Sequence, residues 1–220
     1  MKRLLPALAA AALVTALPGP ALSATTHHDA ANAPAATSTV PARLADTKDA
    51  LRGLWFQHIF WVRNVVLARL GGNAAAAKAA EAEVVANAKA IAGAVEPFYG
   101  KAASDQLFQL LAGHWGAISA YLDATRANSK PQQEAAFAKL GANANAIADF
   151  LASANPHWPA TTLRGLLSAH GAHHVQQIQQ LHAGQYDAEA RIWAAMASHM
   201  NVIADALANG LAAQFPDKFR

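Results

Sequence analysis

Leucine and histidine positions recur along the chain with a constant period. The pattern Leu-x-x-Leu-(Leu/Trp)-x-x-His begins at Leu51, Leu107 and Leu163, and these starts lie 56 residues apart (107 − 51 and 163 − 107). A second set of positions keeps the same period, and its members are Asn87, Asn143 and His199. Three copies without an insertion predict an internal repeat in which each unit is long enough for two helices.

Within each copy the apolar residues are spaced as on one face of an α-helix. The stripes are Leu51, Leu54, Trp55, Val62, Val65 and Val66; Leu107, Leu110, Leu111, Ile118, Tyr121 and Leu122; and Leu163, Leu166, Leu167, Ile178 and Leu181. His58, His114 and His170 lie on the same helical face as these stripes, seven residues after the first leucine of each. We therefore expect the three histidines to point into the core.

The third copy departs from the other two at one step of the stripe. It carries His174 where the first two copies carry Val62 and Ile118. His170 and His174 are one helical turn apart, so this helix alone could offer two imidazole nitrogens to an ion.

Turn and capping residues divide the repeat region into six expected helices. Their expected ranges are 47–70, 74–95, 104–126, 130–154, 161–184 and 187–210, the last fraying towards 214. Pro97 is expected to end the second helix, and Thr47 to cap the first. The sequence thus predicts an all-α protein of three helical hairpins, and we favour a closed up-down bundle over an open solenoid.

Composition supports this fold class and narrows the partners. Of 220 residues, 54% are hydrophobic and 14% are charged, which is typical of a globular domain with one core. Without Lys2 and Arg3, the 17 basic residues become 15 against 14 acidic ones. This near-neutral balance gives no electrostatic basis for binding nucleic acid or an anionic membrane surface.

The N-terminal region reads as a leader followed by a tether. Residues 1–24 combine a basic start, a short apolar run and small residues, as in a secretory signal peptide. The alternative is an uncleaved amphipathic anchor; the run is too short for a confident membrane span. Residues 25–46 are rich in Ala, Thr and Pro and are expected to form a flexible tether to the domain at 47–220. We therefore expect a periplasmic or secreted protein, and the absence of Cys is compatible with either.

Counting outward from the hairpin turns predicts which polar residues lie at the same height. The expected pairs are His58 with Asn87, His114 with Asn143, and His170 with His199. Such a buried polar layer costs free energy unless each member finds a partner.

Two interpretations of the layer remain open. In the first, each histidine is hydrogen-bonded separately and the layer fixes the register of the hairpins. In the second, neutral imidazoles bind one metal ion, most plausibly zinc or copper, while amide oxygens orient the rings. The candidate ligands are His58, His114, His170, His174 and His199. Asn87 and Asn143 are expected to accept hydrogen bonds from the ligand rings. Equivalent residues of an open stack would be about 10 Å apart and could not share an ion.

Common enzyme motifs are absent from the sequence. It contains no glycine-rich phosphate loop, no Gly-x-Ser-x-Gly, no His-Glu-x-x-His and no Glu-x-x-His pair of the di-iron bundles. A haem bound between two of the layer histidines is a further option, but no sequence motif indicates it. We expect a metal-binding protein with a sensing, storage or carrier role rather than an enzyme. The alternatives are a structural or protein-interaction module without metal and, third, a hydrolase that uses metal-bound water.

Five further segments have distinctive aromatic and turn residues, and they are Leu54-Trp55-Phe56-Gln57-His58-Ile59-Phe60-Trp61-Val62-Arg63, Pro97-Phe98-Tyr99-Gly100, Ala148-Asp149-Phe150-Leu151, Asn155-Pro156-His157-Trp158 and Gln214-Phe215-Pro216-Asp217-Lys218-Phe219. Together these motifs resemble a bacterial family of helical proteins with no assigned activity. The resemblance spans Leu51 to Phe219 and implies that the positions of the three layer histidines matter. Where the family pattern usually has Thr, this chain has Val62. Transferase and kinase names carried by members find no support in these residues.

Overall fold

The computed structural model describes residues 42–220 of the chain. The expected signal peptide and most of the expected tether lie outside the described residues. The first helix begins at Ala42, so residues 42–46, expected to belong to the tether, are helical. Thr47 does not cap this helix, because its hydroxyl donates to the carbonyl of Arg43 within it.

The fold is all-α, as predicted, and the described residues contain no strand. The elements in chain order are α1 (Ala42–Leu70), α2 (Ala74–Gly93), α3 (Glu96–Arg126), α4 (Lys130–Ala154), α5 (Ala160–His182), α6 (Tyr186–Gln214) and the short 3₁₀ helix η1 (Pro216–Phe219). None of the helices in residues 42–220 combines the length and the hydropathy needed to cross a membrane.

The expected end of the second helix at Pro97 is wrong. Helix α2 already ends at Gly93, and Pro97 lies in the first turn of α3, where its missing N–H leaves no hydrogen bond unmade. Gly100 interrupts α3 with a φ of 81°, a conformation that glycine adopts without the steric cost of a Cβ atom. The helix therefore begins eight residues before the expected Ser104.

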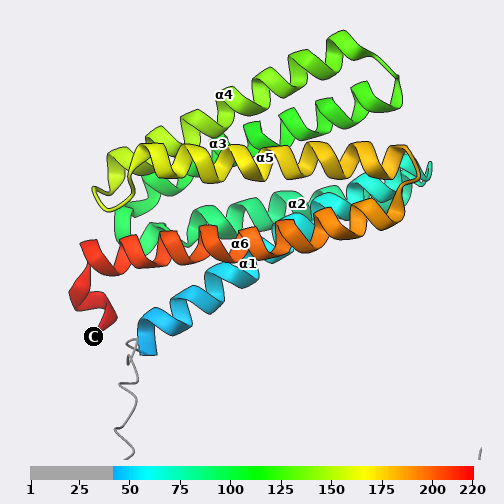
Figure 1. Cartoon of the computed structure of the whole chain (residues 1–220). Coiled ribbons are helices and arrows are strands. Elements are labelled where there is room, and N and C mark those ends of the chain that lie inside the picture. Colours follow the sequence, from blue (N-terminus) through cyan, green and yellow to red (C-terminus); the bar gives the residue numbers. More distant parts are fainter. Residues whose placement is uncertain (1–41) are drawn as a thin grey trace, which may run out of the picture. The chain divides into compact units, whose positions relative to one another are not determined.

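The helices pack so that the three hairpins share one interior (Figure 1). Each helix contacts the next along the chain, and α6 also packs along α1. Helix α5 additionally contacts both α1 and α3. The first helices of all three hairpins are therefore within reach of a common centre.

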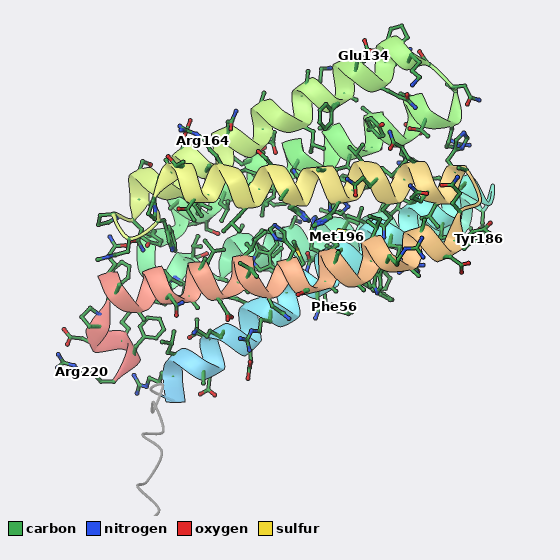
Figure 2. All side chains as sticks on the ribbon, in the orientation of Figure 1. Phe56, Glu134, Arg164, Tyr186, Met196 and Arg220 are labelled. Carbon is green, nitrogen blue, oxygen red and sulfur yellow. The ribbon has the colours of Figure 1, made fainter. Side chains whose placement is uncertain are left out.

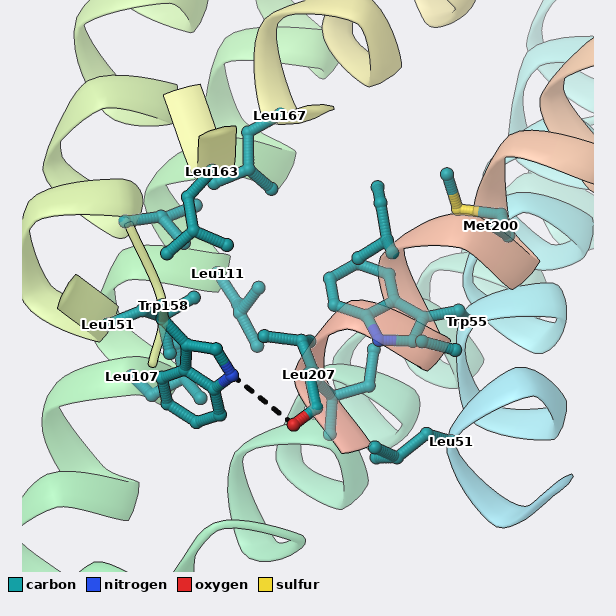
Figure 3. Close-up of a cluster of buried hydrophobic side chains, with 14 of the residues drawn as sticks. Leu51, Trp55, Leu107, Leu111, Leu151, Trp158, Leu163, Leu167, Met200 and Leu207 are labelled. Carbon is teal, nitrogen blue, oxygen red and sulfur yellow. Dashed lines mark hydrogen bonds between the residues drawn. The ribbon is translucent and has the colours of Figure 1, made fainter. Parts of the chain in front are cut away.

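The core consists of two apolar clusters on either side of the histidine positions. Along α1, Trp55 and Ile59 belong to the first cluster and Val62 to the second, with His58 between them. Figure 3 shows the first cluster, where side chains from several helices interdigitate around Trp55 and Trp158. The histidine layer thus lies where the two apolar clusters meet.

One position of the predicted stripe is less buried than expected. Leu54, Leu110 and Leu166 are only half-buried and pack against the edge of the first cluster. At 3.6 residues per turn, this position lies about 60° away from the stripe's first residue and so at the margin of the buried face. Their backbone carbonyls are nevertheless used, as described below.

Three of the motifs that carry the resemblance, those of Tyr99, Asn155 and Gln214, meet at one end of the bundle. Asn155 donates to both the Tyr99 hydroxyl and the carbonyl of Gly210 (3.0 Å each). Trp158 donates to the carbonyl of Leu207 (3.3 Å; Figure 3). Its indole lies so close to Gly210 that a Cβ atom there would clash with it. These contacts join the helices at the end of the bundle that is remote from the histidine layer.

Candidate metal centre

Four buried histidines come from the first helix of each hairpin. His58 lies on α1, His114 on α3, and His170 and His174 lie one turn apart on α5. All four side chains are buried. Figure 2 shows the side chains of neighbouring helices filling the interior of the bundle. Of the five candidate ligands, these four are brought together.

The spacing of the four imidazoles matches the size of a metal site. One ring nitrogen from each histidine lies within 4.8 Å of the other three. The Nε2 atom of His170 is 3.3 Å from Nε2 of His58 and 3.2 Å from Nε2 of His174. Zinc–imidazole bonds of about 2.0–2.1 Å place two nitrogens of a tetrahedral site about 3.3–3.4 Å apart. Two edges of such a tetrahedron are therefore already close to their required length.

His114 completes the group from the other side. Its ring stacks on that of His170, with 5.4 Å between the centroids and 20° between the planes. Neither of its nitrogens has a hydrogen-bond partner within residues 42–220. Buried polar atoms are normally satisfied. A lone pair of His114 is therefore available to an ion without competition from a protein donor.

Burial keeps the four imidazoles neutral. It lowers the pKa of His58 to about 3 and that of His114 to about 4, and Asn143 beside His114 opposes part of the second shift. Burial and the neighbouring histidines also lower the pKa of His170 and His174 well below the ordinary value. Protonation of one ring would place a charge in the apolar core. The neutral form, which is the one that binds metal, is thus present at pH 7.

The second repeating set supports the helices that carry the histidines. Each member bonds to a backbone carbonyl four residues before a layer histidine. The bonds are Asn87 Nδ2 to Leu54 O (3.0 Å), Asn143 Nδ2 to Leu110 O (2.9 Å) and His199 Nε2 to Leu166 O (2.9 Å). No hydrogen bond of normal geometry joins Asn143 to the ring of His114 in the described chain. The amides therefore hold the helices in place more directly than they orient the rings.

The structure does not bring His199 to the four-histidine group. Its Nε2 atom donates to the carbonyl of Leu166, and its ring lies 5.4 Å from that of His173. Both histidines of this second pair are partly exposed. His174 supplies the fourth nitrogen of the buried group.

An ion pair between the half-buried Arg63 and the buried Glu189 lies one turn beyond the centre, and the sequence pattern did not identify Glu189 as a partner. Arg63 donates two hydrogen bonds to Glu189 (2.6 and 2.8 Å), whose side chain is buried, and Gln177 donates a third (2.9 Å). The hydrogen bonds from Arg63 hold the pKa of Glu189 below its ordinary value. Gln177 follows His174 by three residues on α5. The carboxylate is thus ionised and engaged by other groups, and the candidate ligand set consists of imidazoles only.

Trp55 covers the centre on the side of the first apolar cluster. Its ring meets those of His58 and His170 edge-on, with centroids 6.1 and 6.2 Å away. This indole separates the imidazoles from the apolar side chains beneath it.

Comparisons with known proteins give no match: no family model, no curated protein and no solved structure matches the chain. Function is therefore inferred from the four histidines and their surroundings.

Proposed function

We propose that the protein binds one transition-metal ion through His58, His114, His170 and His174. The observation that carries this proposal is the spacing of the Nε2 atoms at 3.2 and 3.3 Å, the edge length of a tetrahedral site. The low pKa values support it, because none of the four ligands has to lose a proton at neutral pH.

The ligand chemistry favours zinc or copper. Imidazole nitrogen suits these metals, whereas magnesium and calcium prefer carboxylate and carbonyl oxygen. Four neutral ligands leave the whole charge of the ion uncompensated. Because the cost of burying a charge rises steeply with its size, monovalent copper loses less hydration energy here than a divalent ion. The close contact of the imidazole nitrogens favours a single ion over haem.

The role most compatible with this site is sensing, storage or transport of the ion. A catalytic zinc keeps one position open for water beside three protein ligands, whereas four protein ligands fill a tetrahedron. A hydrolase that uses metal-bound water is therefore disfavoured. Together with the expected leader, this gives an exported protein that holds a metal ion.

The second candidate is a structural network without metal. The same Nε2 distances also fit hydrogen bonds between neutral rings. The Nε2 atom of His170 could donate to one neighbour or accept from the other, depending on the tautomers. Such a chain would fix the register of three similar hairpins.

Metal titration separates the two candidates. Purified protein would be titrated with zinc(II) and, under reducing conditions, with copper(I), alongside the variants His114→Ala and His182→Ala. His182 lies on the surface and serves as a matched control. We expect one ion per chain for the wild type and the control and a strong loss for His114→Ala. Equal binding by all three proteins, or binding by none, would contradict the four-histidine site.

A further inference from the structure

A small pocket leads from the surface between α2 and α3 to the four-histidine group. The side chain of His58 forms part of its wall. Val85 and Ala112, which are both exposed, line the same pocket. The pocket is therefore a route from solvent to one of the proposed ligands.

The lining of this pocket selects against polar molecules. Apart from His58, its walls are aliphatic and aromatic side chains, among them Phe108 and Trp115. It offers about 50 Å³ to the centre of a water-sized molecule, whereas one water needs only about 10–15 Å³. An ion or a strongly polar molecule would lose its hydration there without replacement. Apolar cavities in proteins instead take up small apolar molecules such as xenon.

A second apolar pocket approaches the same group from the first core cluster. It offers about 30 Å³, and Ile91 and Leu111 line both pockets. Trp55, whose ring touches His58 and His170 edge-on, forms part of its wall. Figure 3 shows Trp55 and Leu111 facing each other across this part of the core. The first pocket thus reaches His58 itself, and the second lies on the far side of Trp55 from the histidines.

We propose that these pockets admit a small uncharged apolar molecule, of the size of dioxygen or nitric oxide, to the His58 side of the four-histidine group. An encounter of this molecule with a metal ion rests on the proposed function. Binding in the pocket does not, because its walls belong to the metal-free protein. A sensing role would then have two components, an ion and a gas-sized ligand.

Xenon tests the pocket without any metal. Crystals of the metal-free wild type would be pressurised with xenon and its position read from anomalous scattering. We expect a xenon atom beside His58. The variant Ala112→Phe should remove it, because the new ring fills the mouth of the pocket, and Val85→Trp should do the same from α2. Ala120→Phe, at an exposed position of α3 outside the pocket, should leave it in place.

Nitric oxide tests the encounter with the ion. Protein loaded with copper(I) would be exposed to the gas, and binding followed by infrared and visible absorption. Because four imidazoles fill the coordination sphere of the ion, nitric oxide has to displace one of them, and His58 is the ligand that lines the pocket. We expect a copper nitrosyl signal that Ala112→Phe slows at least several-fold and Ala120→Phe does not. Absence of xenon beside His58 would overturn the proposal even in a protein that binds metal. Xenon binding in a protein that takes up no ion would instead overturn the proposed function and leave the pocket standing.

Discussion

The third hairpin differs from the first two at positions that all three share in the fold. Val62 on α1 and Ile118 on α3 are buried apolar side chains of the second core cluster. The equivalent residue on α5 is His174, which is equally buried but belongs to the four-histidine group. At this position the first two hairpins therefore contribute an apolar core side chain, whereas the third contributes the fourth candidate ligand.

A second position shows the same contrast. Val65 and Tyr121 belong to the apolar cluster, whereas the equivalent Gln177 donates to the buried carboxylate of Glu189. The third hairpin thus supplies the carboxylate and the amide of this polar group, and Arg63 of the first hairpin supplies the charge opposite the carboxylate. The shared positions of the repeat place three imidazoles in one layer, and the departures of the third copy complete the polar centre around them.

The largest effect is expected from a histidine that all three hairpins share. His170 lies between His58 and His174, within 3.3 Å of both Nε2 atoms. Loss of a group that merely supports a ligand costs about 10–100-fold in metal affinity, so loss of a central ligand should cost more than about 100-fold. Competition with a chelator would measure this for His170→Ala. Retention of wild-type affinity would show that the ion, where it binds, does not use this layer.

Replacing His174, the residue in which the third hairpin differs from the other two, should have a smaller effect on metal affinity. His174→Val makes α5 resemble α1 and leaves three imidazoles, so we expect affinity to fall clearly, but by less than in His170→Ala, rather than to vanish. Metal-free His174→Val should be at least as stable as the wild type, because the unpartnered Nδ1 atom is removed from the core. Titration and denaturant unfolding of the same preparations test both parts. An unchanged affinity would remove His174 from the site.

The reverse change at the sibling position provides the matched control. Ile118→His places an imidazole at the equivalent step of α3, where the neighbours are apolar. We expect the metal-free protein to lose about 1–3 kcal/mol, the cost of a buried polar group without a partner. A stable variant would mean that the second cluster accepts a polar residue in any hairpin, and the contrast between the hairpins would lose its meaning.

Acid should destabilise the metal-free protein through the same histidines. In the unfolded chain they titrate near ~6.5, whereas the pKa values of His58 and His114 in the fold are about 3 and about 4. Between these limits the unfolded state binds more protons, so stability is full above pH ~6.5 and falls as the pH decreases towards the folded pKa values. Each such histidine contributes a slope of up to about 1.4 kcal/mol per pH unit.

The contribution of His174 can be separated in this experiment. The pKa of His174 is lowered mainly by burial, so His174→Val should reduce the slope between pH 6 and 4.5 by about one proton's worth, or ~1.4 kcal/mol per pH unit. Urea unfolding at several pH values would measure it. Equal slopes for the variant and the wild type would show that His174 is not held neutral by the fold.

The smallest effect is expected from the residues that support the helices. Asn87→Ala, Asn143→Ala and His199→Ala each remove one side-chain hydrogen bond to a backbone carbonyl. That carbonyl belongs to a helix, so we expect a loss of about 0.5–1.5 kcal/mol for each, comparable among the hairpins. Denaturant midpoints would measure this. A much larger loss for Asn143→Ala alone would indicate that it holds the ring of His114 as well as the helix.

The 56-residue sequence pattern predicted the burial of three of the four clustered histidines, because they lie on the same helical face as the core leucines. That single periodicity was sufficient to place His58, His114 and His170 inside, and the comparison of copies identified His174. It could not rank His174 above His199, because their distances to the centre depend on how α5 and α6 pack. The ion pair of Arg63 with Glu189 was also beyond the pattern, since it joins helices of different hairpins.

The helix boundaries show where local signals are insufficient. A proline is compatible both with the end of one helix and with the first turn of the next, and here Pro97 lies in the first turn of α3, before the kink at Gly100. Ala42 to Asp46 have the composition of the tether, yet these residues are helical. Contact of Arg43 with the carbonyl of Lys218 joins this turn to η1, a tertiary contact that no local pattern contains.

X-ray absorption spectroscopy of the zinc-loaded protein tests the central claim most directly. The four-histidine site predicts a first shell of four nitrogens at about 2.0–2.1 Å, with the outer-shell scattering of imidazole rings. The spectrum of His174→Val should contain one imidazole fewer and a water or buffer ligand in its place. A shell dominated by oxygen, or a spectrum that His174→Val and His170→Ala leave unchanged, would contradict metal binding by the buried histidines.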